Sequence, residues 1–438
     1  MVNLRSIVKR LIPSGFFKKI EPTGHLIESV LVNIRFGFPS RKMHVIGVTG
    51  TNGKTTTAFM IHKMLTEAGY KTALLSTVAY GIGNDINSQS VHMTTESAPI
   101  MQKRIKGFKR AGVEWLVLET SSHALAQNRI WGIPYEVAVM TNITGDHLDY
   151  HGTFEEYVRA KLKLFQIAAH HGMKLGVVNA DDSSADRFIN AVPSSVTYGI
   201  DNGEVKASKL KLGPSHSTFE VKAGSDKYNM RVNIPGKFNV SNALAAVVVG
   251  RALGLGKSQI ESGVAALEGV EGRMMSIDAG QKFRVLIDFA STPDGFERFF
   301  ESIRPATKRK LIAVFGSAGR RDEAKRAVQG KIAGKNADEV IITEEDDRDV
   351  DGQEIMDQIA SGAKKAGLVA DKNLFMVHNR EEAIGFALTR AKSSHDTVVF
   401  LGKGHEKTIE RADGEYPWNE SEAVRTAIEQ MLAQSKSD

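Results

Sequence analysis

A glycine-rich loop between a buried strand and a helix constrains the fold of this chain more than any other feature. Residues 44–50 read HVIGVTG, and the run GVTGTNGKTTT at 47–57 leads into a helix-length amphipathic stretch. Glycines let backbone N–H groups approach phosphate oxygens, and the N-terminus of the following helix adds positive potential. The sequence therefore predicts a nucleotide phosphate site built by a strand, a loop and a helix.

Two side chains of this loop have defined chemistry. Lys54 can neutralise terminal phosphates, and the Thr55 hydroxyl can bind Mg²⁺. The spacing departs from the generic G-x-x-x-x-G-K-T pattern, because Val48 stands five residues before Gly53. Gly47 or Gly50 must then supply the turn. A glycine turn with a surface lysine is the alternative, and the flanking strand and helix disfavour it.

Short apolar runs alternate with helix-length segments along most of the chain. Five runs in the first half read as buried strands, at 44–50, 72–81, 115–122, 135–143 and 174–181. This alternation predicts a parallel sheet covered by helices, with ligands at the carboxyl ends of the strands. The sheet would form a central P-loop ATPase-type domain of class α/β.

The second half begins differently and then returns to the alternation. Residues 203–234 alternate apolar and polar positions, which predicts a small antiparallel flanking sheet. Helices are expected at 239–253 and 257–267. Five further strands are expected at 283–290, 310–316, 338–343, 374–378 and 396–402. We therefore expect a short basic segment at 1–42, a central domain at 43–272 and a C-terminal Rossmann-like α/β domain at 273–438.

The charge of the chain is concentrated at its start. The net charge is +6, and residues 1–42 hold eight Lys and Arg against two Glu, which leaves the remainder neutral. A diffuse nucleic-acid-binding surface is therefore not expected. The chain has no cysteine and no run of 18 apolar residues, and Lys9, Arg10 and Pro13 interrupt any signal-peptide core. We expect a cytoplasmic enzyme.

Polar residues at predicted strand ends are the candidate catalytic groups. Glu119 ends the run WLVLE, where a carboxylate can face Mg²⁺ across the phosphate loop. Residues 146–152 contain two aspartates and two histidines, which suit Mg²⁺ or Mn²⁺ unless they only cap a turn. Lys161 lies on a helix expected to begin near Phe154, and its spacing alone marks no function.

The C-terminal half carries a second polar set on or after its predicted strands. Its members are Arg273, Asp288, Arg321, Lys325, Arg326, Arg348, Lys403, His405 and Glu406. They suggest a domain that closes on the nucleotide with a substrate site of its own, although charged loops are often only solvated surface. The glycines of residues 401–406 would let the backbone approach a ligand closely.

Together these motifs resemble the Mur ligase family, the ATP-dependent amino-acid ligases of peptidoglycan synthesis, and most of all its tripeptide-forming, MurE-like members. The resemblance covers the chain from about Met43 to the C-terminus. It rests on GVTGTNGKTTT, Thr94-Thr95, ETSSHALAQNR (119–129), TNITGDHLDYHG (141–152), AKLKLF (160–165), NADD (179–182), GKFNVSNALAA (236–246), GRM (272–274), DFASTPD (288–294) and GKGHE (402–406).

The resemblance implies a reaction and its metal site. ATP would phosphorylate a substrate carboxylate, and an amine would then displace phosphate to form an amide. Lys54 and Thr55 would hold phosphates and one Mg²⁺, while Glu119 and His147 would ligate metal. Lys161 matches the family lysine that CO₂ carbamylates to N6-carboxylysine, which would help to bind a second Mg²⁺.

The resemblance also assigns binding residues. For the nucleotide they are Gly50, Thr51, Asn52, Gly53, Lys54, Thr55, Thr56, Asn142, Asn239, Asn242, Arg273 and Asp288. For the muramoyl-dipeptide acceptor they are Thr94, Thr95, Ser121, Gln127 and Arg129. For the incoming amino acid they are Arg321, Arg348, Gly402 and Glu406.

Three departures from the family pattern affect the amino-acid and nucleotide details. Glu345-Asp346-Asp347-Arg348 replaces Asp-Asn-Pro-Arg, Ser291 replaces a histidine, and Arg320 replaces an aspartate. Arg348 can pair bidentately with a carboxylate, which favours meso-diaminopimelate over lysine. The added carboxylates favour a more cationic side chain, such as that of lysine or ornithine.

The segment before Met43 departs most from the family pattern. Tripeptide-forming members carry an N-terminal UDP-binding domain of about 90 to 100 residues, within the usual domain range, and about 42 residues stand here. Apolar residues from Leu4 to Ile12 are spaced as on a helix. This segment can dock on the central domain, or residues 1–20 can lie on an anionic membrane surface. The acceptor could then be a muramoyl peptide held by its peptide end, a lipid-linked precursor or another carboxylate.

Two other functions stay open on the sequence alone. The same fold could use a different acceptor, as folylpolyglutamate and cyanophycin synthetases do, or the chain could be a nucleotide-binding partner that no longer ligates. The retained Lys54, Glu119, His147 and Lys161 favour turnover. We expect a monomer that acts on small molecules.

Overall fold

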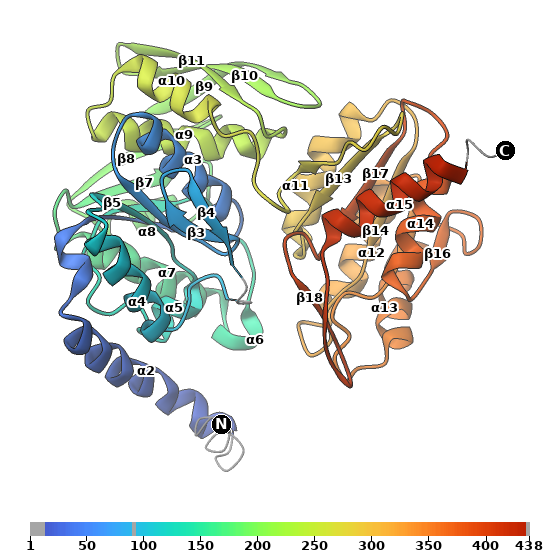
Figure 1. Cartoon of the computed structure of the whole chain (residues 1–438), viewed down its shortest axis with the longest axis horizontal. Coiled ribbons are helices and arrows are strands. Elements are labelled where there is room, and N and C mark those ends of the chain that lie inside the picture. The colour runs from blue at the N-terminus through green and yellow to red at the C-terminus, as the bar shows by residue number, and fades with distance from the viewer. Residues whose placement is uncertain (1–13, 90–92, 435–438) are drawn as a thin grey trace.

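A computed structural model describes residues 14–89 and 93–434 of the chain. Two sheets, each with helices around it, lie side by side with the chain passing from one to the other near α11 (Figure 1). Both sheets combine parallel strands with connecting helices, which confirms the predicted α/β class.

The first sheet has eleven strands in the order β11-β10-β9-β8-β7-β6-β1-β5-β2-β3-β4. Its parallel part consists of β1 (His44–Thr49), β2 (Thr72–Leu75), β5 (Trp115–Glu119), β6 (Tyr135–Met140), β7 (Leu175–Asn179) and β8 (Ser194–Gly199). Its antiparallel edges are β3 (Ala79–Ile82) and β4 (Asp85–Ser88) on one side, and β9 (Val205–Leu212), β10 (Ser217–Ala223) and β11 (Asp226–Val232) on the other.

Helices cover this sheet on both faces because its parallel strands carry buried apolar residues on both sides. Ile46 and Val48 of β1 pack in one cluster with α3 (Lys54–Glu67), α9 (Lys237–Ala252) and α10 (Lys257–Ala265). Val45 packs in the opposite cluster with α4 (Ala98–Arg110) and α7 (Phe154–Ala168). The short helices of this half are α5 (Ser122–Ala126), α6 (Leu148–His151) and α8 (Ala185–Ile189).

One detail of the predicted sheet was wrong. The expected strand at 72–81 is a hairpin of β2 and β3, because Ser76 closes a turn with its hydroxyl donating to the Ala79 carbonyl oxygen at 2.9 Å. The antiparallel strands expected at 203–234 are present and extend the main sheet, since Tyr198 and Gly199 of β8 pair with Val205 and Lys206 of β9. The central sheet is therefore mixed.

The second sheet has six strands in the order β12-β13-β17-β14-β15-β16, all parallel except β12. The strands are β12 (Met275–Ser276), β13 (Arg284–Asp288), β14 (Leu311–Phe315), β15 (Glu339–Ile342), β16 (Leu374–Met376) and β17 (Thr397–Leu401). The helices are α11 (Pro293–Ile303), α12 (Ala324–Asn336), α13 (Gly352–Lys365), α14 (Arg380–Arg390) and α15 (Glu420–Gln434). A separate hairpin of β18 (Thr408–Arg411) and β19 (Gly414–Pro417) follows β17.

Ahead of the first sheet lies α2 (Ser14–Phe36), which packs against α4 and leads through the 3₁₀ helix η1 (Pro39–Lys42) into β1 (Figure 1). A second 3₁₀ helix, η2 (Arg304–Ala306), follows α11. The expected helical spacing from Leu4 to Ile12 lies outside the described residues. Among the residues that the structure does describe, no helix is both long enough and apolar enough to cross a membrane.

Candidate active site

One cavity of about 610 Å³ lies where the carboxyl ends of β1 and β5 face the second sheet. The phosphate loop lines one side, and residues of α11, α12 and the segments after β13, β15 and β17 line the other. This is the edge at which parallel α/β sheets bind ligands.

The phosphate loop depends on two glycines. Gly50 has φ +150°, and a Cβ there would lie 1.9 Å from Thr141 Oγ1. Gly53 has φ +81°, and a Cβ there would lie 2.4 Å from Asn242 Oδ1. Both positions combine a left-handed backbone with a close neighbour, so that only glycine fits. Gly50 is thus the glycine that supplies the turn left open by the unusual spacing.

Residues after β6 hold the loop in shape. The Asn52 backbone N–H donates to Asn142 Oδ1 at 3.0 Å, and Asn142 Nδ2 donates back to the Asn52 carbonyl oxygen at 2.9 Å. Thr51 N–H donates to the Asn142 carbonyl oxygen at 2.7 Å. Asn142 therefore supports the loop as well as lining the cavity.

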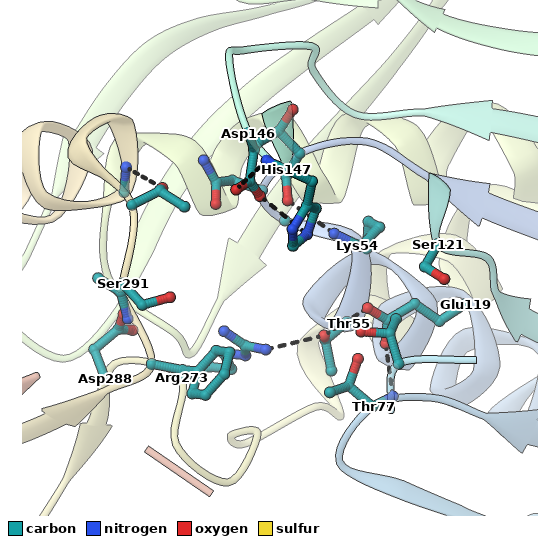
Figure 2. A pocket seen from close by; sticks show the side chains of 18 of the residues that line it. Lys54, Thr55, Thr77, Glu119, Ser121, Asp146, His147, Arg273, Asp288 and Ser291 are labelled. Atoms are coloured by element: carbon teal, nitrogen blue, oxygen red, sulfur yellow. Dashed lines mark hydrogen bonds and ion pairs between the residues drawn. The ribbon is translucent and has the colours of Figure 1, made fainter. Parts of the chain in front are cut away.

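Lys54, Thr55 and Glu119 meet at the start of α3, as Figure 2 shows. Thr55 Oγ1 donates to Glu119 Oε1 at 3.0 Å, and Lys54 Nζ donates to the Thr51 carbonyl oxygen at 2.8 Å. Burial lowers the pKa of Lys54, while Glu119 and Asp146 act to raise it. A hydroxyl and a carboxylate so close together offer two oxygen ligands that suit Mg²⁺.

His147 and Lys161 lie differently from each other. His147 is exposed and lines the cavity, with its Nε2 3.3 Å from Asp146 Oδ2. Lys161 on α7 is buried behind the loop, where its Nζ donates to the Gly50 carbonyl oxygen at 2.6 Å. Burial and the neighbouring Lys54 hold the pKa of Lys161 well below its usual value. This shift favours the neutral form of the amine.

Residues of the second half reach the phosphate loop. Arg273 Nη2 donates to Thr55 Oγ1 at 3.3 Å across the cavity (Figure 2), and its buried Nε has no hydrogen-bond partner among the described residues. Asp288 accepts backbone N–H groups of Met274 and Ala290, both at 2.8 Å. Asn239 and Asn242 line the cavity beside Gly53 and are joined by a hydrogen bond of 2.9 Å. A free buried guanidinium nitrogen suits an anionic ligand.

The predicted acceptor residues divide into lining and supporting groups. Thr94, Ser121, Gln127 and Arg129 line the cavity, whereas Thr95 is buried behind it. The Thr95 hydroxyl donates to the Glu119 carbonyl oxygen at 3.0 Å and accepts from Ser121 N–H at 2.9 Å. Arg129 donates to the carbonyl oxygens of Thr95 and Glu96.

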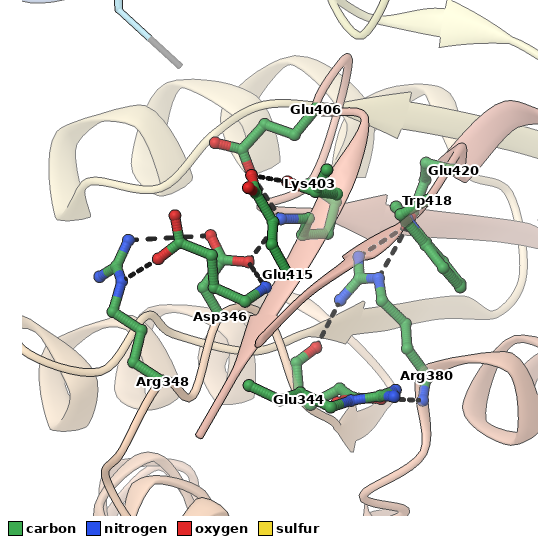
Figure 3. Close-up of polar contacts among 12 residues, drawn as sticks. Glu344, Asp346, Arg348, Arg380, Lys403, Glu406, Glu415, Trp418 and Glu420 are labelled. Carbon is green, nitrogen blue, oxygen red and sulfur yellow. Dashed lines mark hydrogen bonds and ion pairs between the residues drawn. The ribbon is translucent and has the colours of Figure 1, made fainter. Parts of the chain in front are cut away.

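Charges at the far end of the cavity form a network around Arg348 (Figure 3). Arg348 donates to the Glu410 carboxylate and, at 2.6 Å, to the Gly319 carbonyl oxygen. Lys403 is buried and donates to Asp346 at 2.8 Å and to Glu406 at 2.6 Å. Arg348, Asp346 and Glu406 line the cavity, as does the exposed Arg321.

Gly402 and Lys403 do not line the cavity. A Cβ on Gly402 would lie 2.4 Å from Glu345 Oε2, so this glycine makes room for that carboxylate. Burial raises the pKa of Glu345, which lines the cavity and makes no hydrogen bond through its side chain within the described residues. Glu345 is thus a buried acidic residue in the wall of the cavity.

The other departures have structural explanations. Asp347 binds His378 at 2.7 Å, and Arg320 forms an exposed ion pair with Asp349 away from the cavity. Ser291 lines the cavity and accepts Lys325 Nζ at its carbonyl oxygen at 3.0 Å. Arg326 points elsewhere, to Gln358 and the Ala318 carbonyl oxygen.

Sequence reasoning missed three contacts. Thr77 N–H donates to Glu119 Oε2 at 2.8 Å, a backbone contact that no side-chain pattern signals. Asp294 accepts Asn52 Nδ2 at 2.5 Å and so joins the phosphate loop to α11, and its signal was its place in the DFASTPD motif. The third contact is that of Glu410 with Arg348, and Glu410 lies on β18, outside the quoted motifs.

Among the described residues, the one cluster of three His, Asp or Glu ligand atoms within 4.8 Å is Glu344, Asp347 and His378, outside this cavity. Glu344 there already binds Arg411 through both carboxylate oxygens at 2.8 Å. Glu119 and His147 do not form such a cluster.

Comparisons with known proteins agree with this geometry. Residues 48–250 match the Mur ligase middle domain, and residues 272–404 match the Mur ligase glutamate ligase domain. UDP-N-acetylmuramyl-tripeptide synthetase of Roseiflexus sp. strain RS-1 is 39% identical over 427 residues, covering 94% of this chain and 83% of that protein. The chain belongs to the Mur ligase family. Mur ligases are ATP- and Mg²⁺-dependent enzymes that form amide bonds, which confirms the predicted class of enzyme.

Further Mur ligases and a related fold extend the comparison. UDP-N-acetylmuramoyl-L-alanyl-D-glutamate--2,6-diaminopimelate ligase 1 of Clostridium acetobutylicum is 35% identical, covering 97% of this chain and 86% of that protein. A solved structure of a ligase of that name, without the number, superposes with a TM-score of 0.62 at 31% identity, covering 89% and 79% of the two chains. Mycobacterium tuberculosis folylpolyglutamate synthase shares the fold, with a TM-score of 0.73 at 17% identity over 93% and 95%.

Proposed function

We propose that this Mur ligase adds a diamino acid, meso-diaminopimelate or lysine, to the terminal carboxylate of a muramoyl-dipeptide. The observation that supports this function best is the single cavity that the phosphate loop, the predicted acceptor residues and the charges around Arg348 line together. Relatives named as tripeptide synthetases and diaminopimelate ligases support the same reaction.

The reaction runs in two steps. An acceptor carboxylate oxygen attacks the γ-phosphorus of ATP, ADP leaves, and an acyl phosphate forms. The amine of the incoming amino acid then attacks the acyl carbon, loses a proton and expels phosphate, which leaves the amide. Lys54 and Arg273 flank the loop and would offset the negative charge that the reacting phosphoryl group carries, because positioning and charge neutralisation dominate phosphoryl transfer.

The nucleotide would be held by the residues that meet at the loop. The N–H groups of residues 50–55 and the start of α3 suit phosphate oxygens, and Asn142, Asn239, Asn242 and Asp288 surround the space beside them. Thr55 and Glu119 would hold Mg²⁺, which would supply charge neutralisation for the phosphates. The buried Nε of Arg273, which has no hydrogen-bond partner in the described part of the chain, supports an anion at this place.

A second Mg²⁺ would need His147 and a carbamylated Lys161. The neutral form of Lys161 favours carbamylation, in which Nζ attacks the carbon of CO₂ and loses a proton to give an anionic carbamate. The amine is next to Gly50 of the loop, and Lys54, Asp146 and Glu119 are its charged neighbours. A carbamate there would replace a cation that repels metal by an oxygen ligand.

Carbamylation can be tested directly. Enzyme equilibrated with ¹³C-labelled bicarbonate should show a carbamate carbon signal in NMR, and Lys161→Ala should remove it. Lys163→Ala is the matched control, because Lys163 lies on the same helix but binds the Leu125 carbonyl oxygen. Ligation should be lost in Lys161→Ala and should not return with added bicarbonate. An active Lys161→Ala enzyme would refute the role of this lysine.

The charged end of the cavity is proposed to hold the incoming diamino acid. Glu345 offers a carboxylate to a second amino group, and Arg321 and Arg348 offer guanidinium groups to carboxylates. Thr94, Ser121 and Gln127 would hold the acceptor at the opposite end, with Thr95 and Arg129 shaping that wall. Because one chain lines the whole cavity, we further propose that the enzyme works as a monomer in the cytoplasm.

The deciding assay offers UDP-muramoyl-dipeptide with a panel of amino acids and measures phosphate release together with the mass of the product. We expect release that needs both the acceptor and a diamino acid, and none from Lys54→Met. No phosphate release with any muramoyl-dipeptide acceptor would refute the proposed function. A folylpolyglutamate-type acceptor that is used instead would show that only the fold and the chemistry are shared.

A further inference from the structure

Helix α2 has its polar side against the protein and an apolar side toward solvent. His25, Ser29 and Asn33 recur every four residues and are buried, the last two completely. Ile27, Leu31 and Ile34 lie on the other side with 56%, 61% and 61% of their surface exposed, and Ile20 is 38% exposed in line with them. A water-facing helix normally shows the opposite arrangement. We call these four residues the α2 stripe.

The buried polar side fixes which way the stripe faces. Asn33 Nδ2 donates to the Trp131 carbonyl oxygen at 2.8 Å, and Ser29 Oγ donates to the Asn128 carbonyl oxygen at 3.1 Å. Turning the helix to hide the stripe would break these bonds and leave polar groups unsatisfied. The stripe is therefore held outward by the fold.

Basic residues lie beside the stripe. Arg35, Arg41 and Lys42 are exposed at the C-terminal end of α2 and in η1. The adjacent helix α4 carries five Lys and Arg and no acidic residue. Three of these, Lys103, Lys109 and Arg110, are exposed and form no ion pair within the described part of the chain. Glu28, the more exposed of the two acids on α2, is only partly exposed, and its Oε2 lies 3.4 Å from His25 Nδ1.

We infer that the α2 stripe and its basic border form a docking surface for an anionic membrane. An apolar side bordered by Lys and Arg lies in the interface of anionic lipids, with the side chains among the acyl chains and the cations at the headgroups. Trp131 is half-exposed, and its ring centroid lies 6.2 Å from that of Phe38. It adds an aromatic group near the C-terminal end of α2. A second copy would bring two basic borders together, and a nucleic acid would leave the apolar side chains in water.

Docking would place the acceptor end of the active site next to the membrane. Ser29 and Asn33 bind the segment that directly follows Gln127, one of the residues proposed to hold the acceptor. This consequence rests on the proposed function, whereas membrane binding itself does not. An acceptor attached to a lipid could then reach the cavity without leaving the bilayer surface.

Vesicle co-sedimentation of the full chain tests the surface. The probes are vesicles of phosphatidylcholine alone and of an equal mixture with phosphatidylglycerol. Wild-type protein should bind the anionic vesicles, and less so at high salt. The triple variant Ile27→Gln/Leu31→Gln/Ile34→Gln should bind about a hundredfold more weakly, as expected when three large apolar side chains lose their burial.

A control variant and a charge variant separate the causes. Leu212→Gln/Val328→Gln/Val369→Gln changes three other exposed apolar residues, with 50%, 44% and 54% of their surface exposed, and should bind like wild type. Lys103→Gln/Lys109→Gln/Arg110→Gln should reduce the preference for anionic over neutral vesicles about tenfold or more. Phosphate release with a soluble acceptor, measured in parallel, reports on the proposed function separately.

Several outcomes would overturn the inference. One is that wild-type protein does not bind anionic vesicles, and another is that the stripe variant binds them as well as wild type does. A third is that wild-type protein is a dimer that the stripe substitutions dissociate. Binding of a DNA or RNA oligonucleotide without any binding of vesicles would show that the basic border serves a nucleic acid instead.

Discussion

The two ends of the active-site cavity are built in different ways. At the phosphate loop, backbone groups and glycines determine the shape, and Gly50 and Gly53 have neighbours that exclude any side chain. At the amino-acid end, the shape depends on paired charges, in which Lys403 binds Asp346 and Arg348 binds Glu410. The loop end should therefore tolerate almost no change, whereas the amino-acid end should respond to substitutions with altered selectivity.

Gly53→Ala should have the largest effect on turnover. The new Cβ would meet Asn242 Oδ1 at 2.4 Å at φ +81°, which would displace the start of α3 and with it Lys54 and Thr55. Displacing catalytic groups by about 1 Å costs on the order of a hundredfold in rate. We expect a loss of this size in the steady-state rate of phosphate release.

Gly69→Ala is the matched control for that prediction. Gly69 follows the other end of α3 with φ +96°, and nothing lies within 4 Å of a Cβ placed there. The backbone strain is thus similar, while the phosphate loop is untouched. If Gly69→Ala reduced the rate as much as Gly53→Ala, general destabilisation and not the loop would explain the loss.

Asp294→Ala should have the next largest effect, because Asp294 connects the phosphate loop to α11 of the second half. It accepts Asn52 Nδ2 at 2.5 Å, and losing a hydrogen bond to a charged group costs about 1.5 to 3 kcal/mol. We expect kcat/KM for ATP to fall about tenfold or more. Arg298→Met removes the other partner of Asp294 and should leave most of the activity. An equal loss in both variants would argue against the connection.

Glu410→Gln should change selectivity more than rate. Glu410 neutralises Arg348, so removing its charge frees the guanidinium for a substrate carboxylate. We expect the ratio of kcat/KM for meso-diaminopimelate to that for lysine to rise about tenfold. Glu415→Gln, opposite Glu410 on the same hairpin, makes the same charge change and should leave the ratio unchanged. An unchanged ratio in Glu410→Gln would mean that Arg348 does not determine which amino acid the enzyme selects.

The two ends also differed in how well the sequence predicted them. The run 44–57 fixes a strand, a turn and a helix by local pattern, and so Gly53, Lys54 and Thr55 were predictable together with Glu119 at the next strand end. The contacts of Arg348 were not predictable, because Glu410 lies 62 residues away and reaches it only through the β18–β19 hairpin. Asp346 and Asp347 looked available to a substrate from the sequence, yet Lys403 and His378 already bind them.

Long-range folding explains the remaining differences. The hairpin at 72–82 was hidden in a run that resembles one strand, since only Ser76 and Thr77 interrupt its apolar residues and the turn depends on the Ser76 hydroxyl. The outward apolar side of α2 could not be read from spacing either, because periodicity gives the sides of a helix but not which side faces the protein. Buried Ser29 and Asn33 settle that choice through bonds to a segment about 100 residues away.

Glu345→Gln should have the smallest effect, one on stability. Burial raises the pKa of Glu345 above its unfolded value, so the folded state holds this proton more tightly than the unfolded chain does. As pH rises from the unfolded pKa of Glu345 to its folded pKa, the folded protein loses stability. Above the folded pKa, the cost of the buried charge is fully present. Glutamine removes that cost, so the variant should melt a few degrees higher than wild type at neutral pH. The difference should shrink as pH falls toward the unfolded value of about 4.3.

If Glu345 also holds the second amino group of the substrate, the more stable variant should have a higher KM for the amino acid, in keeping with the usual opposition of stability and activity at binding sites. A higher melting temperature with an unchanged KM would leave Glu345 a buried charge with no part in recognition, and binding of the amino acid would then depend on other residues of this end, such as Arg321, Arg348 and Glu406.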